Sequence, residues 1–188
     1  MDANTIISIL IGIGLAASVG FRVFVPLFAL SIATHYNVMP LNESWEWVGS
    51  TTAIVSLGIA TIVEIAAYFI PWVDNLLDTI AIPLAAVAGT AIMVATVADL
   101  SPAITWALAI IAGGGTATAV QTSTSTARLA STATTGGVAN PIISTVETGT
   151  SIVMSILAIF TPVFAIIVVL IIFWILFKIY KRIKSKKE

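Results

Sequence analysis

Long apolar runs separated by short polar segments extend along this whole chain. Each run reaches or exceeds the ~20 residues that a helix needs to cross the hydrocarbon core of a bilayer. The pattern therefore predicts an all-α fold, a polytopic bundle of transmembrane helices. We expect five spans, at about residues 5–33, 51–70, 77–98, 104–135 and 140–177.

The first run is long for a single span, with roughly 29 residues. Gly12, Ala16 and Gly20 recur in it at spacing four, which predicts a stripe of small residues for close helix packing. Arg22 follows, and Pro26 then interrupts the helical hydrogen bonding. Two structures fit this pattern: one long kinked helix, or a helix followed by a shorter re-entrant one.

The fourth run changes composition after a glycine triplet at 113–115. Eleven of the twenty residues from 116 to 135 are serine or threonine, with Gln121 and Arg128 among them. Such a segment suits a surface loop. It also suits a buried helix, because small hydroxyl side chains can return their hydrogen bonds to the i−4 carbonyl. We favour the helix. Asn140-Pro141 then marks the start of the last helix, which we expect to continue through Pro162.

Composition agrees with a membrane protein. Charged residues make up 9% of the chain and apolar residues 59%, whereas soluble domains are roughly 25% charged. The length suits one membrane domain over residues 1–177, followed by a basic tail over 178–188. Because the N-terminus lacks the positive charges of a signal peptide, we interpret the first run as a retained span. The lipid bilayer is the expected partner, and a nucleic-acid partner is excluded because no basic surface exists outside the tail.

Positive charge is distributed very unevenly. Residues 1–177 contain only two basic side chains, Arg22 and Arg128, and both lie inside expected spans. An arginine in hydrocarbon costs at least about 2.5–3.5 kcal/mol. Each of them therefore needs a partner, a water-filled cavity or a ligand.

The basic tail predicts the orientation in the membrane. By the positive-inside rule the C-terminus is cytoplasmic. With five spans, the N-terminus then lies outside and the polar loop 35–50 inside. If Arg22 marks a re-entrant break instead, the span count changes and the N-terminus can lie inside. Tryptophan side chains favour the membrane interfaces, and we expect Trp72 at the outer one and four at the inner one: Trp45, Trp47, Trp106 and Trp174.

The order of an arginine followed by a glutamate occurs twice, as Arg22 with Glu64 and as Arg128 with Glu147. In a five-span topology the corresponding helices would cross in opposite directions, which is typical of an inverted repeat. The separations are unequal, at 42 and 19 residues. Coincidence in a sequence of low complexity explains the order equally well.

The chain resembles a bacterial integral-membrane family catalogued as domain of unknown function 4126. The resemblance extends over most of the sequence and rests on residues 14–27, Glu64, residues 70–74 with Asp78, residues 83–85 with Gly89, Arg128, and residues 140–141 and 144–147. It implies a multi-span protein of the bacterial inner membrane and supplies no activity.

Several positions depart from the pattern of that family. The family tends to have an Asp-Lys pair where this chain has Tyr68-Phe69, and a histidine and a lysine where it has Gln121 and Ser125. An arginine is usual where Ile82 stands. The resemblance therefore supports Arg22, Arg128, Glu64 and Glu147 as the remaining buried charged residues.

Enzymatic chemistry has little support in this sequence. His35 is the only histidine and cysteine is absent, so catalytic triads and metal sites of histidine or thiolate lack their usual ligands. We expect no enzymatic activity, no cofactor and no metal.

Transport is the favoured hypothesis. Arg22 and Arg128 are expected to converge on a polar cavity between the 116–135 helix and the first span, lined by hydroxyls together with Gln121 and Ser125. Two fixed cations among neutral donors suit a small anion or a polar solute with a carboxylate or phosphate. Glu64 and Glu147 then act as counter-ions or proton carriers, because a carboxylate in a low-dielectric interior takes up a proton more readily than one in water.

The alternative hypothesis gives the same residues a structural role. Arg22 pairs with one of the two glutamates and Arg128 with the other, so that the ion pairs only close the bundle. The protein is then a structural or assembly subunit of the membrane. The stripe Gly12, Ala16 and Gly20 fits both hypotheses, as a helix-packing surface first and a homo-oligomer interface second.

Overall fold

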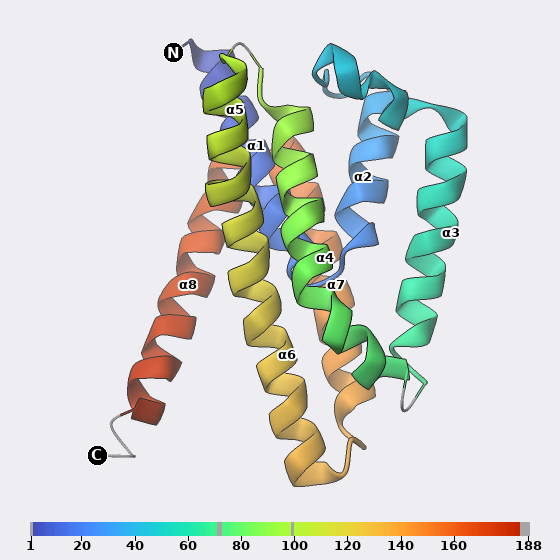
Figure 1. Cartoon of the computed structure of the whole chain (residues 1–188), viewed down its shortest axis with the longest axis vertical. Coiled ribbons are helices and arrows are strands. Elements are labelled where there is room, and N and C mark those ends of the chain that lie inside the picture. Colours follow the sequence, from blue (N-terminus) through green and yellow to red (C-terminus); the bar gives the residue numbers. More distant parts are fainter. Residues whose placement is uncertain (1, 71–72, 99, 185–188) are drawn as a thin grey trace.

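The structure, a computed structural model, describes residues 2–70, 73–98 and 100–184. Every regular element in these ranges is helical, which confirms the predicted all-α fold (Figure 1). Trp72, expected at the outer interface, lies outside the described residues, as does the end of the basic tail.

The elements are α1 (Ala3–Val19), α2 (Phe24–His35), η1 (Glu43–Gly49), α3 (Thr51–Ala67), α4 (Val73–Thr96), α5 (Pro102–Leu108), η2 (Ala109–Gly114), α6 (Gly115–Thr135), α7 (Asn140–Phe160) and α8 (Pro162–Lys184).

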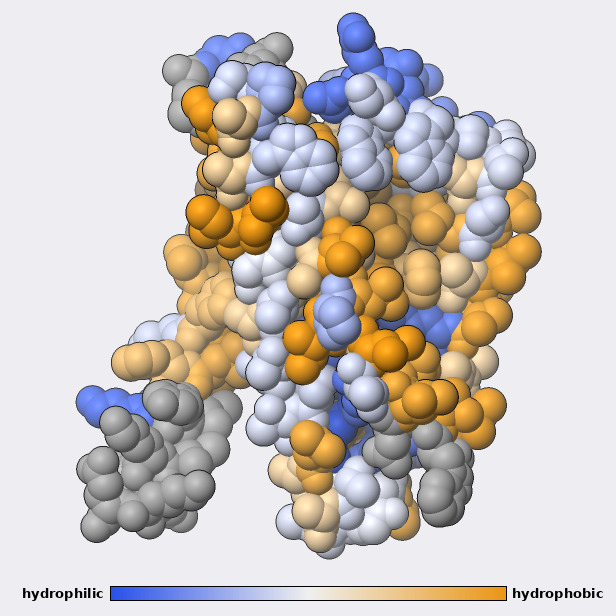
Figure 2. Space-filling model, in the orientation of Figure 1, coloured by the Kyte–Doolittle hydropathy of each residue, from blue (hydrophilic) through white to orange (hydrophobic). Residues whose placement is uncertain are grey.

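In the part of the chain that the structure describes, three helical stretches are long and apolar enough to cross a membrane: Leu76–Thr96, Pro102–Thr135 and Asn140–Phe160. A fourth is reached if η1 and α3, bent by 64° at their junction, are taken as one span. α1, α2 and the part of α8 up to Lys178 are shorter apolar helices. Figure 2 shows hydrophobic residues over the middle of one face and hydrophilic ones gathered at the end near η1. The apolar helices thus agree with a membrane protein, although not with five simple spans.

The first apolar run forms a helical hairpin. α1 ends at Val19, residues 20–23 reverse the chain, and α2 runs back (Figure 1). Pro26 lies in the first turn of α2, where its missing N–H removes no helical hydrogen bond. A proline expected to kink one helix therefore stands at the start of a second, which is the re-entrant alternative.

The hairpin brings the N-terminus and the 35–50 loop to the same end of the bundle. There, the Ala98 N–H donates to Ser8 Oγ at 3.3 Å and the Asn42 N–H to the Ala95 carbonyl at 2.9 Å. The five-span topology placed them on opposite sides, whereas the structure has the re-entrant alternative, in which α1 and α2 together make no net crossing. Trp45, Trp47 and Trp106 lie toward this end, whereas Trp174 is on α8, which runs to the opposite end (Figure 1).

The expected last helix is also two antiparallel helices. The break is at Thr161, whose φ of −140° and ψ of 63° are not helical, and Pro162 begins α8. Residues on either side of the break face the same part of α1: Met154 and Val169 pack in one cluster with Ala17. The Thr-Pro sequence therefore ended a helix that apolar composition alone predicted to continue.

The Ser/Thr-rich segment is helical, as predicted. One face of α6 is buried, and on the other face hydroxyls return to the preceding turn, as when Thr122 Oγ1 donates to the Thr118 carbonyl at 2.8 Å. The π-helical η2 precedes it and contains Gly113, where α4 approaches closely at Gly89. A Cβ on Gly89 would lie 2.8 Å from the Gly113 carbonyl oxygen, so both positions need glycine.

The stripe on α1 packs inside the chain. A Cβ on Gly12 would meet the Thr96 side chain on α4 at 2.7 Å, and one on Gly20 would meet the Ala117 carbonyl on α6 at 2.8 Å. Ala16 between them is fully buried. All three residues therefore lie against neighbouring helices of the same chain.

Candidate functional site: a buried arginine–glutamate centre

Arg22, in the linker between α1 and α2, is 1% exposed and anchors the hairpin turn to α7. Its Nε donates to Thr148 Oγ1 at 3.0 Å, and Nη2 donates to the carbonyl and the hydroxyl of Ser144, both at 3.0 Å. Its Nη1 donates to Glu147 Oε2 at 3.1 Å and to its neighbour's carbonyl, that of Phe21, at 3.3 Å. All five N–H groups of this guanidinium therefore have an acceptor.

Arg128, on the buried face of α6, binds the same carboxylate from another side. Its Nε donates to Glu147 Oε1 at 3.1 Å, and its Nη2 forms an ion pair with Glu147 Oε2. The remaining nitrogen, Nη1, is 3.7 Å from Asp78 Oδ1 on α4. Glu147 is thus shared by two guanidinium groups, one of which it binds in the bidentate geometry typical of arginine and carboxylate.

Tyr68 completes this group of side chains. The Cζ atoms of Arg22 and Arg128 each lie 4.0 Å from the centre of its ring, a distance at which a cation is attracted to the aromatic face. We call Arg22, Arg128, Glu147 and Tyr68 the arginine–glutamate centre. The sequence marked Tyr68 only as a departure from the family pattern. Its contact with the two cations depends on the folded structure.

Glu64 has a different role from the one predicted. It lies on α3 and accepts hydrogen bonds from the backbone N–H of Val23 at 2.8 Å and of Phe24 at 3.0 Å. The first N–H groups of a helix have no partner within it, and the N-cap residue of α2, Val23, supplies no side-chain cap. Glu64 therefore caps α2 from another helix, and the two arginines do not take separate glutamates.

A second layer of polar residues lies beside Arg128, where α4 and α7 begin. Asn140 Nδ2 donates to Asp74 Oδ2 and to Thr132 Oγ1, both at 3.0 Å. Asp74 and Asn140 are both buried. Together with Asp78, Glu64 and Glu147, Asp74 makes four carboxylates near the two guanidinium groups in the described part of the chain.

Gln121 and Ser125 are buried on the same face of α6 as Arg128. Gln121 Nε2 donates to Ser125 Oγ at 3.2 Å, so these two predicted site residues bind each other. Thr124 links α6 to the end of α1 through the Gly20 carbonyl at 3.3 Å. Hydroxyl groups of α6 thus serve helix packing next to the centre.

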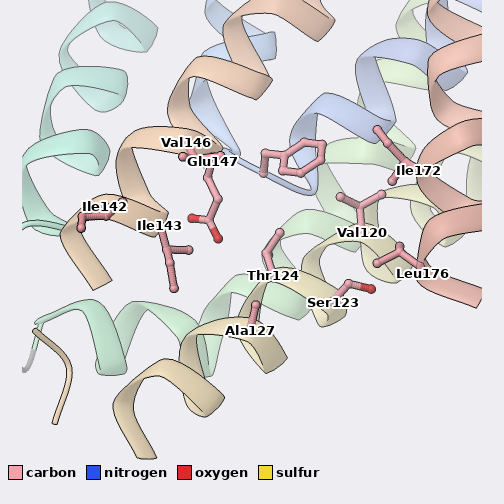
Figure 3. Close-up of a pocket in the computed structure, with 11 residues that line it drawn as sticks. Val120, Ser123, Thr124, Ala127, Ile142, Ile143, Val146, Glu147, Ile172 and Leu176 are labelled. Atoms are coloured by element: carbon pink, nitrogen blue, oxygen red, sulfur yellow. The ribbon is translucent and has the colours of Figure 1, made fainter. Parts of the chain in front are cut away.

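Two apolar pockets flank the centre. One, of about 320 Å³, lies between α6, α7 and α8 and is lined by eight apolar side chains with Ser123, Thr124 and Glu147 (Figure 3); we call it the lateral pocket. The other, of about 290 Å³, lies between α2, α3 and α4 beside Glu64 and Tyr68. Both pockets are lined mainly by apolar side chains, and each has one glutamate in its wall.

The two halves of the supposed repeat are built differently. Arg22 lies in a linker between antiparallel helices, whereas Arg128 lies within a continuous helix. Glu147 binds both arginines and Glu64 binds backbone. The geometry thus gives the inverted repeat no support.

The family described as "Domain of unknown function (DUF4126)" matches residues 9–182. The chain belongs to this family. The DUF4126 match includes the whole arginine–glutamate centre and Glu64, and its description names no activity. No curated protein and no solved structure matches the chain.

Proposed function

We propose that this DUF4126 protein is a small membrane carrier for an anion or a small polar solute with a carboxylate or phosphate group. The guanidinium groups of Arg22 and Arg128 bind the acidic group of the solute. Glu147 occupies that position when no solute is bound. The observation behind the proposal is that two arginines from different elements converge on one carboxylate inside the bundle.

The break between α1 and α2 supports this function. Many transporters bind solutes near the middle of the membrane at discontinuous helices, whose ends supply charge and free backbone groups. Arg22 lies at such a break, and the N-terminus of α2 already binds one carboxylate, that of Glu64. The site therefore combines two guanidinium groups with a helix N-terminus, three groups that each favour anions.

Charge balance gives Glu147 a part in the cycle. The two guanidinium groups are balanced by the carboxylates of Glu147 and of Asp78, which lies 3.7 Å from Arg128, so an anion binds here by exchange with Glu147. The incoming anion takes over the bonds that Glu147 makes to Arg22 and Arg128, so the charge next to the two guanidinium groups is unchanged by the exchange.

A second candidate function is purely structural, and one observation favours it. Every N–H of Arg22 is already bound within the chain. A buried ion pair of this kind fixes the register of helices and adds little net stability. The protein is then a membrane assembly subunit with a permanently closed centre.

Exchange measurements distinguish the two functions. The purified full chain is placed in liposomes loaded with unlabelled phosphate or gluconate, and the entry of the radiolabelled anion is followed. A carrier exchanges at least one of them faster than protein-free liposomes do. Arg128→Gln abolishes the exchange while circular dichroism still shows a folded helical protein, and the matched control Lys178→Gln, on an exposed residue of α8, exchanges normally. If the wild type exchanges neither anion and Arg128→Gln only unfolds the protein, the structural function stands.

A further inference from the structure

The lateral pocket borders the arginine–glutamate centre from the side of α8. Its inner wall contains Glu147, which is 4% exposed and bound to both arginines. Figure 3 shows the carboxylate of Glu147 between α7 and the Thr124 side chain on α6. A molecule in the pocket therefore has one carboxylate between itself and two guanidinium groups.

The mouth of the pocket opens on the apolar surface of the helices. Ile142 and Val146 line it from α7 and are 69% and 63% exposed, and Ala127 on α6 is exposed as well. In Figure 1, α8 leans away from α6 toward its C-terminal end. Because these exposed lining side chains are apolar, we expect the mouth to face lipid and a ligand to enter from the bilayer.

The surface that lines the pocket is almost wholly apolar. Eight of its eleven lining side chains are apolar, which suits a hydrocarbon chain. The other three are Ser123, Thr124 and Glu147, and the carboxylate of Glu147 is bound to two cations. A ligand that reproduces this arrangement has an apolar chain and one terminal anion of the size of a carboxylate. A cationic head group does not suit the site, because Arg22 and Arg128 stand directly behind Glu147.

We propose that the lateral pocket binds a single-chain fatty acid, whose carboxylate replaces that of Glu147 on Arg22 and Arg128 and whose chain lies between α6, α7 and α8. The inference rests on the proposed function, since it names the substrate class of the same site. No covalent step is involved. The exchange is one carboxylate for another at the two guanidinium groups.

Chemical rescue tests the inference. Glu147→Ala removes the internal carboxylate and leaves room for an external one. The full-length variant is placed in lipid nanodiscs, and its unfolding temperature is measured with increasing acetate, octanoate, methyl octanoate or octyltrimethylammonium. We expect both carboxylates to raise the unfolding temperature, octanoate at a concentration at least tenfold lower than acetate. The neutral ester and the cation, which have chains of similar length, leave the variant unchanged.

A pair of matched substitutions separates the pocket from simple partitioning into lipid. Ala127 and Ala130 are both exposed alanines of α6, and only Ala127 lines the pocket. In the Glu147→Ala background, Ala127→Phe should reduce the rescue by octanoate at least tenfold and leave the rescue by acetate unchanged. Ala130→Phe should change neither.

Each outcome has a defined meaning. If acetate and octanoate rescue equally, or if Ala127→Phe leaves the octanoate effect intact, the fatty-acid inference is wrong while the anion site remains. If no carboxylate rescues the variant, the proposed function fails as well. A stabilisation by diacyl phosphatidic acid that exceeds that by octanoate would assign the pocket to a phospholipid and overturn the inference.

A measurement on the wild type replaces the rescue if Glu147→Ala does not fold. Binding of fluorescent 11-(dansylamino)undecanoate to the wild-type protein in nanodiscs is followed by its emission, and octanoate is added as competitor. We expect saturable binding that Ala127→Phe weakens at least tenfold and Ala130→Phe preserves. The absence of saturable binding to the wild type overturns the inference.

Discussion

Glu64 caps a helix to which it does not belong: from α3, its Oε1 accepts the backbone N–H of Val23 at 2.8 Å, just before α2 begins. Its other oxygen accepts the N–H of Phe24. A helix that starts inside the bundle has no water to bind these groups, so their partner has to be supplied by the protein.

Replacing Glu64 tests this cap. Glu64→Ala leaves two buried N–H groups without an acceptor, at a cost of about 1–3 kcal/mol for each. Glu64→Gln keeps one carbonyl acceptor and should lose about half as much. The free energy of unfolding in lipid bicelles measures both, with Glu43→Ala on the exposed face of η1 as control. Equal stability of wild type and Glu64→Ala would show that the cap is dispensable.

The two arginines should differ in their tolerance of lysine. Lysine keeps the charge but has three donors in place of five and no planar fork. Arg22 uses all five donors toward four different residues, whereas Arg128 binds chiefly one carboxylate. We expect Arg22→Lys to destabilise the protein by about 3–5 kcal/mol, the range for breaking a buried ion pair, and Arg128→Lys by clearly less. Equilibrium unfolding measures the loss of stability in both variants. A larger loss in Arg128→Lys than in Arg22→Lys would refute the prediction.

The aromatic ring of Tyr68 should matter more than its hydroxyl group. Tyr68→Phe keeps the face over which both guanidinium groups lie, so its stability should remain close to that of the wild type. Tyr68→Leu removes the face and should cost about 0.5–2 kcal/mol for each cation. Tyr36→Leu, at an exposed tyrosine, is the control. Identical unfolding of the Phe and Leu variants would contradict a cation–aromatic interaction here.

Two glycines in spanning helices should respond to alanine with opposite signs. Gly89→Ala brings a methyl group within 2.8 Å of the Gly113 carbonyl oxygen, and overpacking of this kind costs about 1–3 kcal/mol. A Cβ on Gly149, in α7, meets nothing within 4 Å. Gly149→Ala should therefore stabilise the helix by roughly 0.5–1 kcal/mol. Thermal unfolding in nanodiscs measures both, and a loss of stability in Gly149→Ala would reveal a contact at that exposed position.

The amino-acid sequence predicts the elements of this fold better than their directions. Apolar runs and the hydroxyl-rich segment all became helices, because these properties are local. The reversal at 20–23 was one of two alternatives and the one at Thr161 was missed, since a proline in an apolar run is compatible with both a kink and a helix start. Which of the two occurs depends on packing against α3, α4 and α7.

The candidate site shows the same division. Scarcity of charge in a membrane chain identifies Arg22, Arg128, Glu64 and Glu147 without a structure. The low number of charged residues does not reveal which glutamate binds which arginine, because two arginines and two glutamates can pair in several ways. Glu64 binds backbone groups that exist only once the hairpin has formed, and the part of Tyr68 depends on a ring position that spacing along the chain does not encode.

The hairpin of α1 and α2 also sets an order of events during biosynthesis. Its turn is held by Glu64, then by Ser144, Glu147 and Thr148, all of which leave the ribosome after residue 22 because chains are made from the N-terminus. Until α7 has emerged, Arg22 lacks its hydrogen bonds to Ser144, Glu147 and Thr148. The turn of the N-terminal hairpin therefore gains its full set of contacts only after α7 has been made, although it is translated first.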